Sequence, residues 1–178
     1  MSVGSNSVPA VELDVLIEDS RWDALGIENI ATRAVIETVA TLNVQGDVIE
    51  LSLLACDDAR IAALNTTFRD KPTPTNVLSW PEDDLAPPHP GDQPIRPTAD
   101  PDGTLALGDI AIAYDTCACE ASAGDKPLSD HVTHLLVHGL LHLLGYDHVD
   151  DADAALMERL EVEILGKLGL NDPYTDNT

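Results

Sequence analysis

The sequence predicts a single α+β domain over residues 1–178, in which a small mixed β-sheet packs against about five helices. A length of 178 residues is usual for one domain. Apolar residues make up 44% of the chain and charged residues 23%, as in ordinary globular proteins. Strand patterns and helix patterns mix without regular alternation, which favours the α+β class.

Two strand patterns, each followed by a helix pattern, occupy the first part of the chain. Apolar residues recur at every second position over 11–17 and again over 49–55, which predicts strands with one buried face. Apolar residues at helical spacing predict a helix over 30–42. After the second strand, Asp57 can cap a further helix, because its side chain can accept a hydrogen bond from the first turn.

Prolines dominate the middle of the chain. The prolines at 72, 74 and 81 interrupt any helix in that region. They leave residues 76–80 as a short extended segment. Seven of the twelve prolines lie between residues 81 and 101, among many aspartates. Residues 82–104 are therefore predicted to form a proline-rich acidic insert, as a surface loop or a disordered segment. Its simplest interpretation is a solvated spacer.

The last part of the chain predicts one strand and three helices. The segments are a strand over 105–114 and helices over 115–124, 129–144 and 150–169. Ser129 or Asp130 can cap the long central helix. The predicted buried stripe of the final helix comprises Leu156, Leu160, Ile164 and Leu168.

Charge and cysteine content restrict the partners and the compartment. Thirty-two acidic residues against nine basic ones give a net charge of -23. This charge predicts repulsion from nucleic acid and from anionic membranes, so a role on RNA would require recruitment by a protein partner. The three cysteines do not form a disulfide framework or a CxxC pair. Residues 1–14 do not resemble a signal peptide, so a cytoplasmic location is expected.

The most informative segment carries three histidines in the pattern HxxxHxxGxxH. A spacing of four places His138 and His142 on one face of a helix, about 6 Å apart along its axis. Gly145 can adopt a left-handed conformation that reverses the chain, so His148 can return to the same point. The pattern therefore predicts a metal site at the C-terminal end of the central helix.

Three histidine ligands leave a fourth position open, which is the pattern of a catalytic zinc site. Bound zinc lowers the pKa of water towards about 7 and polarises a carbonyl or phosphoryl oxygen. Three imidazoles also accept nickel or copper, so the residues alone leave the metal open. We expect one Zn²⁺ per chain, held by His138, His142 and His148.

The other histidines of the chain, and Asp147, have simpler interpretations. His89 and His131, taken singly, are most simply hydrogen-bonded core histidines. His134 lies one turn before His138 and is expected to support packing or a ligand histidine. Asp147 can either orient a ligand histidine or cap the turn.

The histidine spacing equals that of the metzincin peptidases, HExxHxxGxxH, with one difference. Gly139 stands where those peptidases carry the glutamate that activates the attacking water. Peptide hydrolysis is therefore a weaker interpretation of this site.

Beyond the histidines, the chain resembles the YbeY family of bacterial endoribonucleases and rRNA maturation factors. The run HGLLHLLGYDH over 138–148 resembles the hallmark of that family. Residues 64–69 with 74–81, and residues 107–110 with 120–121, resemble two further signatures, and 157–174 resembles the last helix and tail. Three features depart from the family: Pro72 in the loop after the arginine, Trp80 in place of phenylalanine, and the length of the insert.

The resemblance implies a zinc-dependent endoribonuclease that cleaves single-stranded RNA. It also implies a role in 3′-end maturation of 16S rRNA and in ribosome quality control, with the small ribosomal subunit as partner. The resemblance also implies that Arg69 is the catalytic residue, and its planar cationic group suits two phosphate oxygens. Without the resemblance, Arg69 is most simply a surface arginine in a salt bridge. The alternative is a non-catalytic, zinc-containing ribosome assembly factor whose metal mainly holds the fold.

Overall fold

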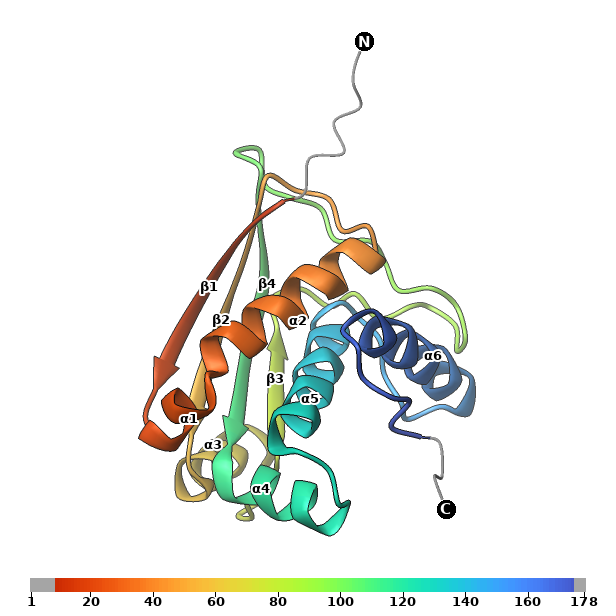
Figure 1. Cartoon of the computed structure of the whole chain (residues 1–178). Coiled ribbons are helices and arrows are strands. Elements are labelled where there is room, and N and C mark those ends of the chain that lie inside the picture. The colour runs from red at the N-terminus through yellow and green to blue at the C-terminus, as the bar shows by residue number, and fades with distance from the viewer. Residues whose placement is uncertain (1–8, 175–178) are drawn as a thin grey trace.

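The computed structural model describes residues 9–174, which form four strands and six helices (Figure 1). Residues 1–8 and 175–178 lie outside the described residues. They include both ends of the predicted domain and the first part of the segment 1–14, which was predicted not to be a signal peptide. The elements in chain order are β1 (Ala10–Ile17), α1 (Ser20–Leu25), α2 (Ile27–Thr41), β2 (Val48–Cys56), α3 (Asp58–Arg69), β3 (Val77–Pro81), β4 (Thr104–Ala113), α4 (Tyr114–Ala123), α5 (Leu128–Leu143) and α6 (Asp151–Lys167).

The strands form one mixed sheet in the order β1-β2-β4-β3. Strands β1, β2 and β4 are parallel, and the short strand β3 pairs with β4 in the antiparallel direction. The predicted α+β class and the predicted mixed sheet are confirmed. The described residues contain six helices, one more than predicted, and the additional helix is α1.

Helix α1 has only six residues, too few to show a helical period in the sequence. Asp19 caps its start, and Gly26, with φ of +82°, separates it from α2. Because of this break, α2 begins at Ile27 and not at residue 30 as predicted. Trp22 of α1 is fully buried, and its indole N–H donates a hydrogen bond to the backbone oxygen of Cys56 at 2.8 Å. This contact fixes α1 to the end of β2.

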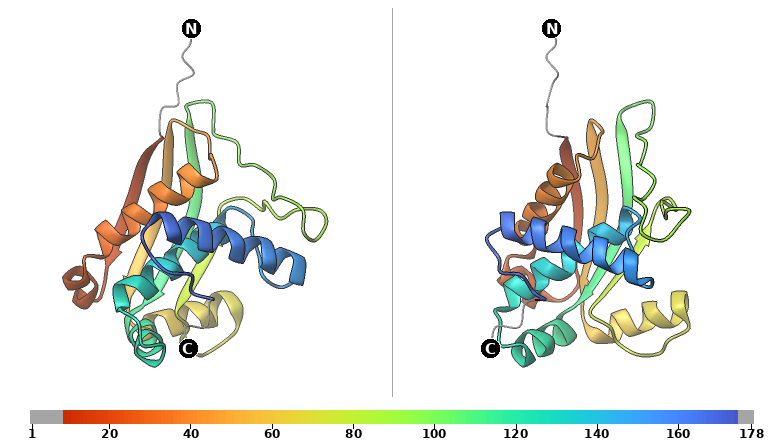
Figure 2. Two further views of the ribbon diagram at one scale, coloured as in Figure 1. Left: turned by 45° about the vertical axis from the view of Figure 1, so that its right-hand side comes forward. Right: turned by 90° about the vertical axis from the view of Figure 1, so that its right-hand side faces the viewer.

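The helices cover the two faces of the sheet unequally (Figure 2). Helices α2, α5 and α6 lie over one face and enclose the larger core with β2 and β4. Fully buried residues of this core include Ile49, Leu53, Ile112, Leu140 and Ile164. On the other face, α3 covers a smaller cluster that includes Ile61, Leu78 and Ala111. The remainder of that face exposes acidic side chains such as Glu12, Asp14 and Asp109.

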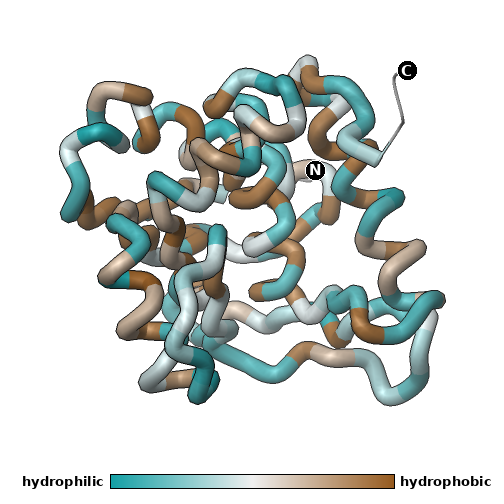
Figure 3. Tube along the Cα trace, turned by 90° about the horizontal axis from the view of Figure 1, so that it is seen from below, coloured by the Kyte–Doolittle hydropathy of each residue, from teal (hydrophilic) through white to brown (hydrophobic). Residues whose placement is uncertain are grey.

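One prediction about the last helices is wrong, and another is confirmed only in part. Helix α5 begins directly after Pro127, so neither Ser129 nor Asp130 caps it. In the predicted stripe of α6, Leu156 and Ile164 are buried, whereas Leu160 and Leu168 are only partly buried. The other buried residues of α6 are Met157, Glu161 and Leu165. The prediction used a strict step of four residues, which drifts around a helix of 3.6 residues per turn, whereas the true stripe mixes steps of three and four. Figure 3 shows the resulting alternation of hydrophilic and hydrophobic residues along the helices.

Residues 82–103 connect β3 to β4 without forming a helix or strand, and they pass beside the start of α6 (Figure 2). Leu85 is buried, and its backbone oxygen accepts a hydrogen bond from the Ile95 N–H at 2.9 Å. The Gly91 N–H donates to Asp153 of α6 at 2.7 Å. The segment is therefore a surface loop that is anchored to the domain at Leu85 and Gly91, while most of its other residues are exposed, and its interpretation as a spacer stays a prediction.

The three cysteines are free thiols; Cys56 and Cys117 are buried, and Cys119 is exposed. Burial raises the pKa of the Cys56 thiol and of the Cys117 thiol to about 12, so both are protonated at neutral pH and poorly reactive. Among residues 9–174, no helix has the length and apolar character required to cross a membrane.

Candidate metal centre and active site

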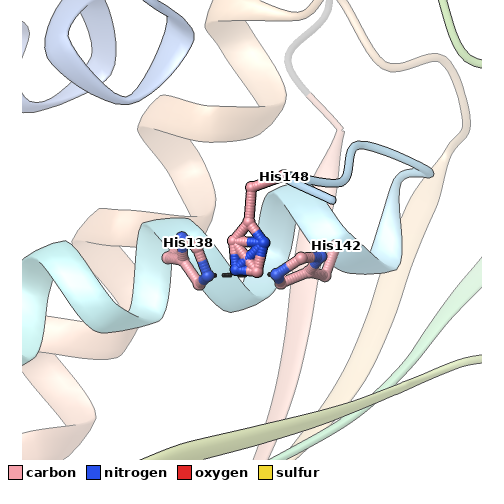
Figure 4. Close-up of side chains that lie close together, drawn as sticks. All are labelled: His138, His142 and His148. Atoms are coloured by element: carbon pink, nitrogen blue, oxygen red, sulfur yellow. Dashed lines mark hydrogen bonds between the residues drawn. The ribbon is translucent and has the colours of Figure 1, made fainter. Parts of the chain in front are cut away.

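The three histidines of the motif meet at the C-terminal end of α5 (Figure 4). His138 and His142 occupy successive turns of α5, and their Nε2 atoms lie 3.0 Å apart. The ring of His148 lies 5.1 Å, between centroids, from each of the other two rings. One nitrogen from each ring lies within 4.8 Å of the others, so the group can hold a metal ion.

The return of His148 depends on Gly145, which adopts the predicted left-handed conformation with φ of +100°. This conformation strains any residue with a Cβ atom. The space is also closed, because a Cβ atom at Gly145 would lie 2.6 Å from the backbone oxygen of Leu85 in the insert. Glycine is therefore required here by both conformation and space.

Hydrogen bonds fix the tautomers of two of the histidines. Nδ1 of His142 lies 2.9 Å from the backbone oxygen of Tyr146, and Nδ1 of His138 lies 3.3 Å from Oε2 of Glu161. A carbonyl oxygen and an ionised carboxylate only accept hydrogen bonds, so each Nδ1 carries the proton and each Nε2 presents a lone pair.

Two bare lone pairs 3.0 Å apart repel each other unless a cation lies between them. Two nitrogen ligands of a tetrahedral zinc ion would lie about 3.3 Å apart, because each bond is about 2.0 Å long. The donor set therefore fits a metal ion in both its protonation and its spacing.

The surroundings of His142 favour its neutral form. Burial lowers the pKa of His142 to about 4, and the neighbouring His138 and His148 also lower it. The hydrogen bond to the Tyr146 backbone raises this pKa, but by less. Neutral imidazole is the form that binds a metal, so His142 is ready for this role at neutral pH.

A buried carboxylate behind the histidines was missed by the sequence prediction. Glu161 accepts hydrogen bonds from Nε2 of His134 at 2.7 Å and from the hydroxyl of Tyr174 at 2.8 Å, in addition to the longer contact with His138. Burial opposes ionisation of Glu161, but these three hydrogen bonds outweigh burial and lower its pKa to about 2. The available signal was an acidic residue among apolar ones at helical spacing.

Arg69 lines the same cavity as the three histidines, which has a volume of about 770 Å³. Among the described residues it is the only lysine or arginine in the cavity wall. Asp70 ends α3 in a left-handed conformation, with φ of +55°. The buried amide of Asn65 donates to the backbone oxygen of Thr73 at 2.9 Å and holds the loop that contains Pro72. The fold therefore places one cationic group in the wall of the cavity that contains the three histidines.

Comparison with known proteins identifies the family. The sequence model of a family described as Endoribonuclease YbeY matches residues 14–169. The chain belongs to the YbeY family. A protein from Ruegeria pomeroyi named Endoribonuclease YbeY is 59% identical over 163 residues, which cover 92% of this chain and 98% of that protein. The protein of the same name from Jannaschia sp. is 56% identical over 164 residues, covering 92% and 100%.

More distant similarities agree with this membership in the YbeY family. An Endoribonuclease YbeY from Bradyrhizobium sp. is 41% identical over 169 residues, which cover 94% of this chain and 95% of that protein. A solution structure of a Thermotoga maritima protein matches with a TM-score of 0.54 at 16% identity, covering 93% of this chain and all of the other. This last similarity concerns the fold alone. The resemblance found in the sequence is confirmed.

Other candidate residues of this YbeY chain lie beside the centre or away from it. His134 supports the site as expected, through Glu161. Asp147 accepts a hydrogen bond from the backbone N–H of His148 at 2.7 Å, as the turn-capping alternative predicts, and its Oδ1 also lies 3.7 Å from Nδ1 of the His148 ring. His131 is hydrogen-bonded to Glu120 at 2.8 Å, as expected. His89 is exposed in the insert, so its interpretation as a core histidine is wrong.

Gly139 of this YbeY chain faces the sheet. A Cβ atom there would lie 3.3 Å from Cδ1 of Ile110 and 3.6 Å from Oγ of Ser79. A glutamate side chain at this position would have to displace β3 or β4. The glycine therefore allows α5 to lie close to the sheet, and the peptidase interpretation loses its general base.

Proposed function

We propose that this chain is a zinc-dependent endoribonuclease that cleaves single-stranded RNA. The observation that carries the proposal is the shared cavity, where three histidines suited to a metal ion stand with Arg69. The relatives named Endoribonuclease YbeY support RNA as the substrate. Phosphodiester cleavage requires stabilisation of the charge that develops on the phosphate, and this cavity contains groups suited to that task.

His138, His142 and His148 would hold one Zn²⁺ ion. When bound, zinc supplies Lewis acidity towards a phosphoryl oxygen and makes hydroxide available near neutral pH. Arg69 would bind two phosphate oxygens through its planar guanidinium group and stabilise the transition state. Its side chain is available for this role, because Arg69 is exposed and none of the ion pairs among residues 9–174 involves it.

We further propose that the protein acts with the small ribosomal subunit in the cytoplasm, in 3′-end maturation of 16S rRNA and in ribosome quality control. The net charge of -23 supports recruitment by a ribosomal or accessory protein, because free RNA is repelled by such a chain. The free thiols are compatible with a reducing compartment.

The test replaces Arg69 by alanine and measures cleavage of a single-stranded RNA by the zinc-loaded protein. We expect a loss of about 100-fold or more, as for removal of one transition-state donor, with zinc content and melting temperature retained. The matched control is Arg60→Ala on the same helix, since Arg60 pairs with Glu18 at 3.3 Å outside the cavity wall. Unchanged cleavage by Arg69→Ala would remove the catalytic role of Arg69.

Metal removal tests the other half of the proposal. Chelation should abolish cleavage, and one equivalent of Zn²⁺ per chain should restore it. If the metal-loaded protein bound small subunits but cleaved no RNA in their presence or absence, the non-catalytic assembly factor would be the better description.

A further inference from the structure

Glu161 is a buried carboxylate on the otherwise apolar buried face of α6. Its exposed fraction is 1%, and it lies in the stripe of α6 that also contains Met157, Ile164 and Leu165. Moving a carboxylate out of water costs several kcal/mol unless hydrogen bonds and opposite charge compensate for it. The contacts of Glu161 must therefore account for its presence.

The three groups that contact Glu161 all line the cavity of the candidate metal centre, and one of them is a candidate metal ligand. Oε2 accepts hydrogen bonds from His134 at 2.7 Å and from His138 at 3.3 Å, and Oε1 accepts one from the hydroxyl of Tyr174 at 2.8 Å. None of the ion pairs among residues 9–174 joins Glu161 to a lysine or arginine. Of the two histidines that contact Glu161 within residues 9–174, His134 would supply a cation only by taking up a proton, whereas His138 can connect Glu161 to a metal cation through its other ring nitrogen.

We propose that Glu161 is the positioning residue of the metal centre, which holds His138 with Nε2 directed at the metal, and that Tyr174 holds Glu161 in place. The inference rests on the proposed metal-dependent function. A carboxylate behind a ligand histidine fixes the tautomer and the ring orientation and makes the imidazole a stronger ligand. Nδ1 of His142 donates to a neutral group, the backbone oxygen of Tyr146, whereas Nδ1 of His138 donates to the charged carboxylate of Glu161.

Tyr174 makes the C-terminal segment part of this support. Its ring lies edge-on to the ring of His134, with 5.6 Å between the centroids, and it lines the cavity that contains the histidines. The hydroxyl of Tyr174 is also 3.3 Å from Nε2 of His134. Loss of this hydroxyl would free Glu161 on one side without changing its charge.

The experiment compares the affinity of Glu161→Gln and of the unaltered full chain for Zn²⁺, by competition with a chromophoric chelator. Glutamine keeps the size of the side chain and removes its charge. We expect the affinity to fall by about 10- to 100-fold, the usual effect of losing such a partner. The matched control is Glu163→Gln, because Glu163 lies on the same helix and its carboxylate pairs with Lys167 at 3.4 Å on the surface. This control should bind Zn²⁺ like the unaltered protein.

A second measurement separates positioning from a merely structural role. With saturating Co²⁺ in place of zinc, the visible absorption spectrum reports the ligand field, so Glu161→Gln should change the spectrum while Glu163→Gln leaves it unchanged. Tyr174→Phe should change it in the same direction by a smaller amount. Tyr174 is nearly half exposed, so this variant provides the test if Glu161→Gln does not fold.

The outcomes distinguish the two proposals. If the unaltered protein bound neither Zn²⁺ nor Co²⁺, the proposed function would fail and this inference with it. If the unaltered protein bound metal and the folded Glu161→Gln and Tyr174→Phe variants matched it in affinity and spectrum, only the role of Glu161 would be overturned.

Discussion

Replacement of Gly145 by alanine should both destabilise the domain and weaken metal binding. Gly145 has φ of +100°, and a Cβ atom there would lie 2.6 Å from the backbone oxygen of Leu85. A left-handed conformation costs a residue with a Cβ atom about 1–2 kcal/mol. Relief of the contact requires movement of the insert or of the turn, for which overpacking suggests about 1–3 kcal/mol. The expected loss of unfolding free energy is therefore about 3 kcal/mol.

Two other glycines separate these contributions. Gly169 has φ of +85° and no atom within 4 Å of an added Cβ, so Gly169→Ala should show the conformational cost alone, about 1 kcal/mol. Gly166 lies in α6, has no positive φ and also has no atom within 4 Å of an added Cβ. Because alanine favours the helix more than glycine does, Gly166→Ala should stabilise the protein by about 0.5 kcal/mol. The same chemical change thus has three different expected effects.

Thermal melts of the metal-free proteins provide the measurement. For a chain of this size each kcal/mol corresponds to about 2–4 °C, so Gly145→Ala should melt about 6–12 °C below the unaltered protein. Zinc affinity should fall only in Gly145→Ala, because the turn at Gly145 places His148. If Gly145→Ala and Gly169→Ala melted at the same temperature, the contact with Leu85 would carry no energy and the reasoning would be refuted.

Three further predictions concern other parts of the molecule. In the metal-free protein, the unfolding free energy should decrease as the pH falls from 6.5 towards 4, because His142 takes up a proton near 6.5 when unfolded but only near 4 when folded. The full shift of the His142 pKa corresponds to about 3 kcal/mol of unfolding free energy, and solvent screening reduces this to about 2 kcal/mol. Urea titrations at pH 6.5 and pH 4 would measure the difference. Trp22→Phe leaves the backbone oxygen of Cys56 without its indole donor and should cost about 2 kcal/mol in urea unfolding; an unchanged midpoint would contradict this. Gly139→Glu should lower the melting temperature through its contact with Ile110 and should not cleave a peptide panel, whereas a stable, active peptidase would contradict the packing argument.

The histidine cluster could be predicted from the sequence because its geometry is local. One helical turn and one glycine reversal, both within residues 138–148, determine where the three rings lie. The alternating strands were predictable for the same reason, since a period of two belongs to each strand alone. The order β1-β2-β4-β3 depends on pairing between distant segments, and periodicity does not encode it.

Glu161 could not be predicted because the rotation of α6 about its own axis is determined by packing against α5 and α2. The predicted stripe contained Leu160, one residue away, and placed the buried carboxylate outside it. Arg69 was expected only from family resemblance, since its approach to the histidines depends on where α3 ends relative to α5. The attachment of the insert involves backbone groups of Leu85 and Gly91, which composition does not reveal.

Apart from Arg69, the groups described at the metal centre come from α5 or from residues that follow it, as far as Tyr174. Translation proceeds from the N-terminus, so a nascent chain exposes its complete sheet before it has made these groups. An unfinished polypeptide that ends before these residues therefore lacks the groups of the candidate metal centre, and the last of these groups to be made is Tyr174.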